Sequence, residues 1–377
     1  MHSPVERRRR GGLGASGALA ILALSLMIPV RLFAQGGVLV QGIVDAEMWS
    51  TDSGSSLLTK NHARPGGLGR LDLWGAVEPW RGLVIYAQGE GAAGPAQNDR
   101  GRADYDLEQA GVRWSPTGMY ALDIGKMPDP VGTFAARRFS TRNPLIGEPD
   151  GYPVVYPLGA QFSAANTHFD FRIAAVSLPL THPGYVPDPS AALRPAVGAG
   201  FTPFTGLRIG ASGTWGPYLN ASLPAPLLAG QSWQHFQQRI AALDLAYSHD
   251  YLEVHAEYAR GSYDVPGFSD PVAGETWYVE AKRAFGPRVF VAARVERNNY
   301  PFIAPAGPST WIGSDTDFDD GEIGAGYRVS ASLLVKASYR MDHWYITPAQ
   351  RAFLGPGGHA FAVQFSQSFD VLAVLAG

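Results

Sequence analysis

Four basic residues lie close together in one stretch of the chain: Lys126, Arg137, Arg138 and Arg142. A guanidinium group presents planar donors that match the geometry of a carboxylate or a phosphate. Several such groups beside a polar wall attract anions by charge and by hydrogen bonding. These residues therefore favour non-covalent selection of anionic solutes, which requires elements that hold them around a passage.

No arrangement of residues for bond-making chemistry stands out. The sequence has no Gly-x-Ser-x-Gly turn, no phosphate-binding glycine loop, no dinucleotide fingerprint and no haem attachment motif. It also has no cysteine, which excludes disulfides, thiolate nucleophiles and thiolate metal ligands. We therefore predict a protein that is not an enzyme and holds no cofactor.

Two acidic patterns have spacings that metal ligands also use. The stretch from Asp315 to Gly321 is similar to a calcium loop, but its glycine comes one place late and Gly326 stands where a bidentate Glu is needed. A solvated acidic loop is the favoured interpretation. Glu253, His255 and Glu257 alternate on one face of a predicted strand, and we interpret them as wall residues rather than metal ligands.

Residues 1–34 have the layout of a secretory signal peptide. Four consecutive arginines from Arg7 to Arg10 precede a mostly apolar stretch, and small Ala34 precedes Gln35. An uncleaved membrane anchor is the alternative. Removing this segment takes away five basic residues and one acidic residue, so the net charge moves from −3 to −7. An acidic mature chain, residues 35–377, lacks the basic footprint of a nucleic-acid-binding protein.

The mature chain repeats one pattern, about ten residues that alternate apolar and polar. In the first repeat Val40 and Val44 share one face, while Asp45 and Glu47 share the other. Alternation at period two places one side of a strand in an apolar medium and the other in a polar one. Helical periodicity is almost absent, so the sequence predicts an all-β protein.

The breaks between these repeats are short and long in turn. The short breaks fall near residues 80, 116, 166, 203, 249, 286 and 330. The long segments are 50–66, 94–104, 128–157, 179–193, 216–236, 261–274, 298–319 and 345–357. This order predicts a transmembrane antiparallel β-barrel of about 16 strands, with short periplasmic turns, long extracellular loops and both chain ends on the turn side. A soluble sandwich is the alternative, but it would not sort its connections so regularly.

The polar face of these strands carries both signs of charge. Arg113, Arg172 and Arg340 are expected to face the lumen, and so are Asp45 and Glu47. With Lys126, Arg137, Arg138 and Arg142 they form the candidate pore-constriction and solute-contacting set. The arginines argue for a local anion preference, and the acidic surplus of the wall argues against a strong one.

The layout resembles the Gram-negative porins over the whole mature chain. The stretch from Leu107 to Pro116, followed by 122–126, resembles a strand–turn–strand of the phosphate-selective porin O and P type. Alternate aromatics from Phe361 to Phe369 resemble the barrel-assembly signal, although residues 370–377 continue beyond it. The resemblance implies an outer-membrane protein whose third loop, 128–157, folds into the lumen. It allows a homotrimer, with membrane lipid and lipopolysaccharide as surroundings.

We therefore predict an outer-membrane porin, a water-filled channel for passive diffusion of small hydrophilic solutes. The sequence leaves open whether this channel prefers anions. One alternative for 128–157 is an external loop whose arginines contact lipopolysaccharide phosphates or water. Two alternative functions are a barrel-embedded enzyme acting on lipid or lipopolysaccharide, and a non-conducting structural or adhesive barrel. The sequence leaves the solute and the oligomeric state open.

Overall fold

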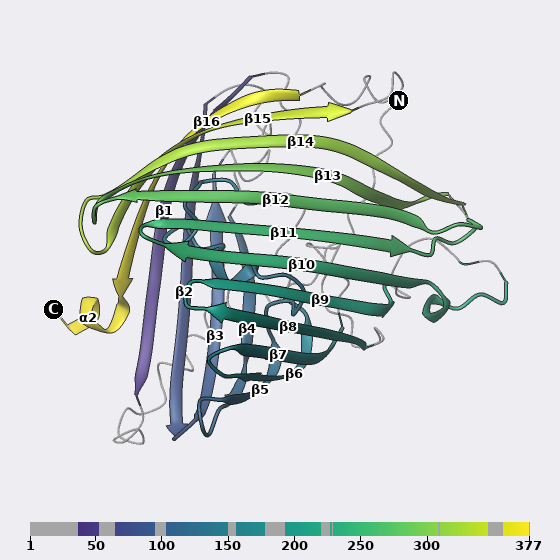
Figure 1. Cartoon of the computed structure of the whole chain (residues 1–377), viewed down its shortest axis with the longest axis horizontal. Helices are drawn as coiled ribbons and strands as arrows, with labels where there is room; N and C mark the ends of the chain where they lie inside the picture. The colour runs from purple at the N-terminus through teal and green to yellow at the C-terminus, as the bar shows by residue number, and fades with distance from the viewer. Residues whose placement is uncertain are drawn as a thin grey trace.

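A computed structural model of the chain shows one closed antiparallel barrel of sixteen strands, in which β1 pairs with β16 (Figure 1). It describes residues 37–52, 65–94, 103–149, 156–177, 193–219, 227, 229–307, 310–345 and 357–376. The predicted signal peptide, 1–34, lies outside the described residues. The predicted fold class and strand number are confirmed.

Neighbouring strands in the chain are neighbours in the sheet all round the barrel. The strands are β1 (Val38–Thr51), β2 (Gly66–Trp80), β3 (Leu83–Ala93), β4 (Asp104–Trp114), β5 (Tyr120–Lys126), β6 (Leu158–Ala165), β7 (Phe169–Val176), β8 (Arg194–Phe204), β9 (Leu207–Pro217), β10 (Gln237–His249), β11 (Leu252–Tyr263), β12 (Val272–Phe285), β13 (Val289–Gly307), β14 (Thr310–Arg328), β15 (Leu333–Tyr345) and β16 (Gly357–Asp370). All seven predicted short breaks are turns between consecutive strands. The first residues of β1 and the last residues of β16 lie at this turn end of the barrel, as predicted for the two ends of the chain.

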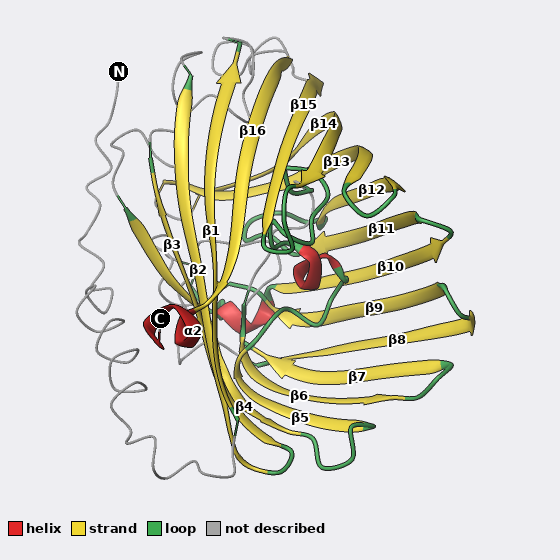
Figure 2. Cartoon of the chain, turned by 90° about the vertical axis from the view of Figure 1, so that its left-hand side faces the viewer, coloured by secondary structure: helices red, strands yellow, loops and turns green. Residues whose placement is uncertain are grey.

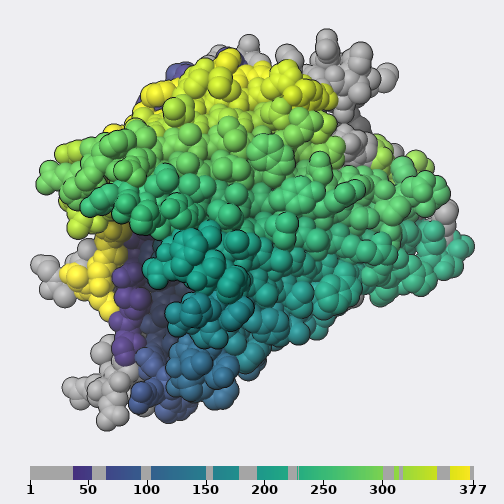
Figure 3. Space-filling model, viewed as in Figure 1, coloured from purple at the N-terminus to yellow at the C-terminus, as the bar shows by residue number. Residues whose placement is uncertain are grey.

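The alternation in the sequence sorts side chains between the two faces of the wall. On β13, Val291 and Val295 are 42% and 53% exposed on the outside, whereas Arg294 and Glu296 are buried inside. Leu243 and Asp244 on β10 repeat this arrangement, and so do Tyr339 and Arg340 on β15, because successive side chains point to opposite faces. The outer surface is therefore apolar, and the charged residues line the interior. Figure 3 shows that outer surface as a continuous layer of side chains over the front wall.

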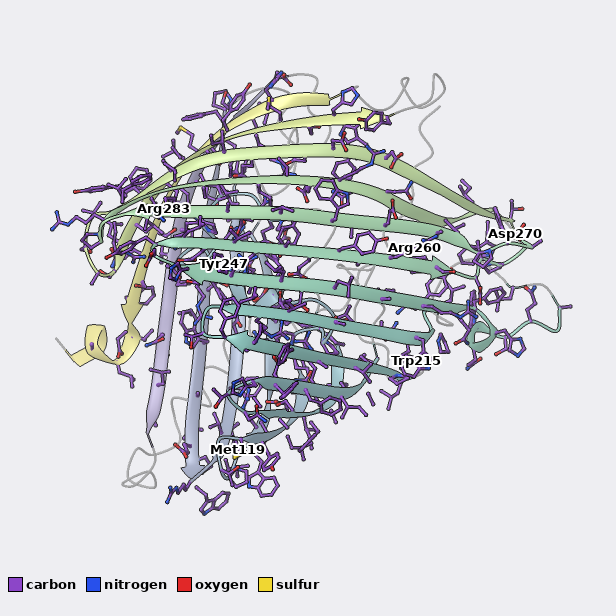
Figure 4. The ribbon with its side chains drawn as sticks, in the orientation of Figure 1. Met119, Trp215, Tyr247, Arg260, Asp270 and Arg283 are labelled. Carbon is purple, nitrogen blue, oxygen red and sulfur yellow. The ribbon has the colours of Figure 1, made fainter. Side chains whose placement is uncertain are left out.

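The strands are strongly tilted, as closure of a barrel requires. In Figure 2, β1–β3 on one side cross β7–β12 on the other at a steep angle. Tyr247 and Arg283 lie at the turn end of the front wall, and Arg260 and Asp270 lie towards the opposite end (Figure 4). Polar and amphipathic side chains thus stand at both ends of the apolar band, where the water interfaces of a membrane would be.

The prediction of a long loop over residues 298–319 is wrong. Strands β13 and β14 continue through most of it and are 19 residues each, so they form a hairpin that extends beyond their neighbours. The charged residues in this stretch pair across the ladder: Arg297 bonds to Asp319 at 3.1 Å and to Asp317 at 3.4 Å. Polar composition indicated a loop, but cross-strand ion pairs make the same residues compatible with an extended strand.

The residues after the last strand form a short helix, α2 (Val371–Ala376). Asp370 begins it, because its Oδ1 accepts hydrogen bonds from the amides of Leu372 and Ala373 at 2.9 and 3.1 Å. The continuation of the chain past Phe369 is therefore an ordered cap outside the sheet. Among the described residues no helix is long and apolar enough to cross a membrane.

A lysine on the outer face tests the assignment of that face to lipid. Ile323 lies on β14, between Ala293 of β13 and Tyr339 of β15, and is 61% exposed. We expect Ile323→Lys to destabilise the folded barrel by about 2–4 kcal/mol in a bilayer, because a charged side chain would enter the hydrocarbon. The measurement is denaturant unfolding in lipid vesicles. Ala331→Lys, in the exposed β14–β15 turn, is the matched control, and an equal effect of both changes would contradict the assignment.

Candidate functional site

The segment between β5 and β6 lies inside the barrel. It leaves the wall after Lys126, the last residue of β5. The preceding Gly125 has a positive φ of 140° and so close a backbone neighbour that a Cβ would overlap the carbonyl oxygen of Ala110. Pro128 and Pro130 then prevent continuation of the sheet. The described part, residues 127–149, contacts inward-facing residues of at least three sectors of the wall. The predicted entry of the third loop into the lumen is confirmed, and the external-loop alternative is wrong.

The first contact sector is the wall from β7 to β11. The amide of Gly132 donates to Ser212 Oγ at 3.1 Å, and its carbonyl accepts from Arg172 at 2.8 Å. Thr133 donates through its amide and its hydroxyl to the two oxygens of Glu257, at 3.0 and 2.8 Å. The beginning of the loop is therefore held by direct hydrogen bonds to charged and polar wall side chains.

The short 3-10 helix η2 (Phe134–Arg137) packs against β12 through the side chains of Phe134 and Arg137. The ring of Phe134 packs edge-on against Tyr278 with centroids 6.2 Å apart. Arg137 donates to Glu280 at 2.7 Å and to the Tyr278 hydroxyl at 3.1 Å. Phe134 and Tyr278 also belong to a buried apolar cluster with Val131, so this side of the lumen is filled.

Arg138 reaches the opposite sector, formed by β2, β3 and β4. One of its nitrogens contacts Glu108, lies 2.6 Å from Glu90 and 3.7 Å from Asp72. Burial alone would lower the pKa of Arg138, but Tyr156 and carboxylates including Glu108 outweigh it and hold the pKa above its usual value. Arg138 therefore remains charged, and it fixes the middle of the loop to an acidic wall.

The later part of the loop is held by β13, β14 and β15. The ammonium group of Lys336 donates to the carbonyl oxygens of Ser140, Asn143 and Leu145 at 2.9, 3.0 and 2.8 Å. Lys336 is only 2% exposed, so it replaces water as the donor for three peptide groups.

Glu322 and Arg294 complete this sector. Glu322 accepts from the amides of Ile146 and Gly147 at 3.2 and 3.0 Å, and Arg294 donates to the Gly147 carbonyl at 3.1 Å. A Cβ at Gly147 would lie 2.6 Å from a carboxylate oxygen of Glu322. Glycine at this position allows the loop backbone to approach both charged side chains.

The predicted site residues separate into three groups. Arg137, Arg138 and Arg172 bond to the loop or the wall as described above. Arg340 contacts Asp320 at 2.5 Å and Glu296 at 3.4 Å, and Arg113 lies 3.7 Å from Asp123 and is half exposed. The remaining residues lie on the wall or at the free surface of the loop: Lys126 donates to the Leu107 carbonyl, Asp45 and Glu47 are buried, and Arg142 is exposed.

Arg142 differs from the other two loop arginines. Its side chain donates to the carbonyl of Ala136 at 3.2 Å and forms no ion pair with a described residue. The pattern of basic residues grouped all three together, but the structure uses two of them to fix the loop.

The loop also contains a buried carboxyl group, that of Asp129. Burial raises the pKa of Asp129 to about 6, even though the amide of Val131 donates a hydrogen bond to it.

Sequence reasoning missed the role of several wall residues. Glu108 was not expected in the lumen, because the alternation puts Gln109 there. A β-bulge in β4, opposite Gln88 and Gly89 of β3, turns both Glu108 and Gln109 inward. Gln88 donates to Glu108 at 2.7 Å. The alternation of β13 and β15 turns Arg294 and Lys336 inward, but their loop partners lie about 150–200 positions away in sequence, where no local pattern connects them.

The two metal-like patterns of the sequence do not form sites among the described residues. Residues 315–321 lie within β14, so the solvated-loop interpretation is wrong and no calcium loop is formed. Glu257 bonds to Thr133 and Tyr278, and Glu253 bonds to Lys282 at 2.9 Å. These residues line the wall, as predicted.

No protein-family model and no curated protein matches the chain. Solved structures do match. An anion-selective porin from Comamonas acidovorans aligns with a TM-score of 0.60 at 10% identity, over 89% of this chain and 100% of that one. OmpT of Vibrio cholerae, folded in vitro, aligns with a TM-score of 0.58 at 12% identity, over 89% and 98%. Salmonella typhi OmpF, in complex with daunomycin, gives 0.57 at 12%, over 88% and 97%. The fold is that of the outer-membrane porin barrels.

The three-carbonyl contact of Lys336 can be tested by a change that keeps the length of the side chain. We expect Lys336→Met to destabilise the loop by about 1–3 kcal/mol, because buried carbonyls lose their donor. Limited proteolysis within residues 140–147 should become faster. Lys282→Met removes a half-exposed pair with Glu253 and should leave this cleavage unchanged. Equal cleavage of the two variants would contradict the anchoring role.

Proposed function

We propose that the chain forms a water-filled channel in a bacterial outer membrane, through which small hydrophilic solutes diffuse passively. The observation that carries this proposal is a charged loop held across the interior of a barrel whose outer face is apolar. Such a loop narrows the passage and takes part in no chemical step, so the function that we propose is not enzymatic. The likeness to porin structures supports the architecture.

The proposed ion preference is a local one for anions, and it rests on Arg142. Arg137 and Arg138 are compensated by Glu280 and by the carboxylates of β2–β4, so their positive charge is largely cancelled for a passing solute. Arg142 is exposed and lacks such a partner among the described residues. The Comamonas acidovorans neighbour is an anion-selective porin, which agrees with this proposal.

We also propose the membrane surroundings, the oligomeric state and the export of the protein from its barrel fold and its structural neighbours. Membrane lipid and lipopolysaccharide would cover the apolar outer face, with the short turns periplasmic and the long loops extracellular. A homotrimer is proposed because OmpT, one structural neighbour, is described in a trimer form. Export would depend on the predicted signal peptide.

Planar-bilayer recording tests the channel and its preference together. Purified protein should give stepwise ionic conductance, and the reversal potential in a salt gradient should indicate a modest anion preference. We expect Arg142→Gln to shift the reversal potential towards cations, because it removes the uncompensated positive charge. Arg260→Gln, on the outer face of β11, should leave it unchanged. Absence of conductance would contradict the proposed function and favour a plugged barrel.

A further inference from the structure

Three carboxylates converge inside the barrel at the place where Arg138 contacts the wall. Asp72 on β2, Glu90 on β3 and Glu108 on β4 each offer an oxygen within 4.8 Å of the others. Asp72 and Glu90 are direct partners in the β2–β3 register. Glu108 joins them because of the β-bulge in β4, so a local departure from regular strand geometry brings the third carboxylate into the group.

A single guanidinium nitrogen does not satisfy all three groups. The same nitrogen of Arg138 contacts Glu108 and lies 2.6 Å from Glu90, and it has only two hydrogens to donate. Asp72 is 3% exposed, and its Oδ1 lies 3.7 Å from this nitrogen without a hydrogen bond to any donor. A buried carboxylate oxygen that has only this long ion-pair contact favours a further cationic ligand.

Among the described residues, the cations of the surrounding wall are shared with other partners. Arg70 lies 3.8 Å from Glu90, but it also faces Asp45 across the β1–β2 ladder. Asp45 is 2% exposed and neither of its oxygens has a hydrogen-bond partner. Lys336 directs its three donors to loop carbonyls, and Lys126, near Glu108, donates to the carbonyl of Leu107. This sector of the lumen therefore keeps a surplus of buried negative charge.

We propose that Asp72, Glu90 and Glu108 form a binding site for a hard divalent cation, with Ca²⁺ the ion that fits best. The three residues provide only carboxylate oxygens, and Ca²⁺ accepts six to eight oxygen ligands in flexible geometry, including water. Arg138 occupies the same oxygens, so the ion and the guanidinium group compete. Binding of Ca²⁺ displaces Arg138 and releases the middle of the loop from β2–β4.

Calorimetric titration of the folded protein in detergent with Ca²⁺ tests the site directly. Arg138→Gln removes the competing charge at a distance of a few ångströms, so we expect it to tighten Ca²⁺ binding by at least about tenfold. Adding Asp72→Asn to that variant should abolish the gain. Arg137→Gln, the same substitution one position earlier, removes a pair with Glu280 instead and should leave Ca²⁺ affinity unchanged.

Terbium luminescence gives a second measurement that needs no change at Arg138. The ring of Tyr156 lies 5.4 Å from the guanidinium carbon of Arg138, close enough to sensitise Tb³⁺ bound at the carboxylates. The unchanged protein should show this luminescence, Ca²⁺ should suppress it, and Asp72→Asn should remove it.

Equal Ca²⁺ affinity of the Arg138→Gln and Arg137→Gln variants would overturn the proposal. Terbium luminescence that is insensitive to Asp72→Asn would also overturn it. Both measurements are made in detergent on protein whose barrel is intact by circular dichroism, so they do not depend on whether the barrel conducts ions.

Discussion

The interior of this barrel depends on one requirement, that peptide groups and charges removed from bulk water find partners. The described part of the loop between β5 and β6 lies in the lumen without a sheet or a long helix to satisfy its backbone. Charged wall side chains satisfy it instead: Lys336 donates to three carbonyls, and Glu322 accepts from two amides. The position of the loop, the width of the passage and the charge left for a solute all follow from these contacts.

The same requirement explains why the basic loop and the acidic wall occur together. Arg137 and Arg138 compensate carboxylates that would otherwise be buried without a cation, and those carboxylates keep the two arginines from acting freely on a solute. A count of basic residues in the loop therefore overstates its attraction for anions. Selectivity depends on the charges that remain after pairing, and Arg142 is the loop arginine that the structure leaves exposed.

The sequence predicted the barrel well because period-two alternation is a local property, and short turns such as the one near residue 166, between β6 and β7, follow from where it breaks. It failed where cross-strand contacts override composition: Arg297, Asp317 and Asp319 extend β13 and β14 through an expected loop. It also missed Glu108, because one inserted residue reverses the alternation. The entry of the third loop came from family resemblance, but its partners on the wall are too distant in sequence for any local pattern to identify.

The absence of cysteine makes one measurement especially direct. A single Arg142→Cys change gives the protein one thiol, placed at an exposed position of the loop inside the barrel. We predict that a negatively charged, membrane-impermeant thiosulfonate reagent reduces the single-channel conductance of this variant in planar bilayers, because it puts a bulky negative group where Arg142 attracts anions, and that the reagent has no effect on the unchanged protein. A thiol that reacts fully without altering conductance would contradict the central claim that the wall-anchored loop sets the passage.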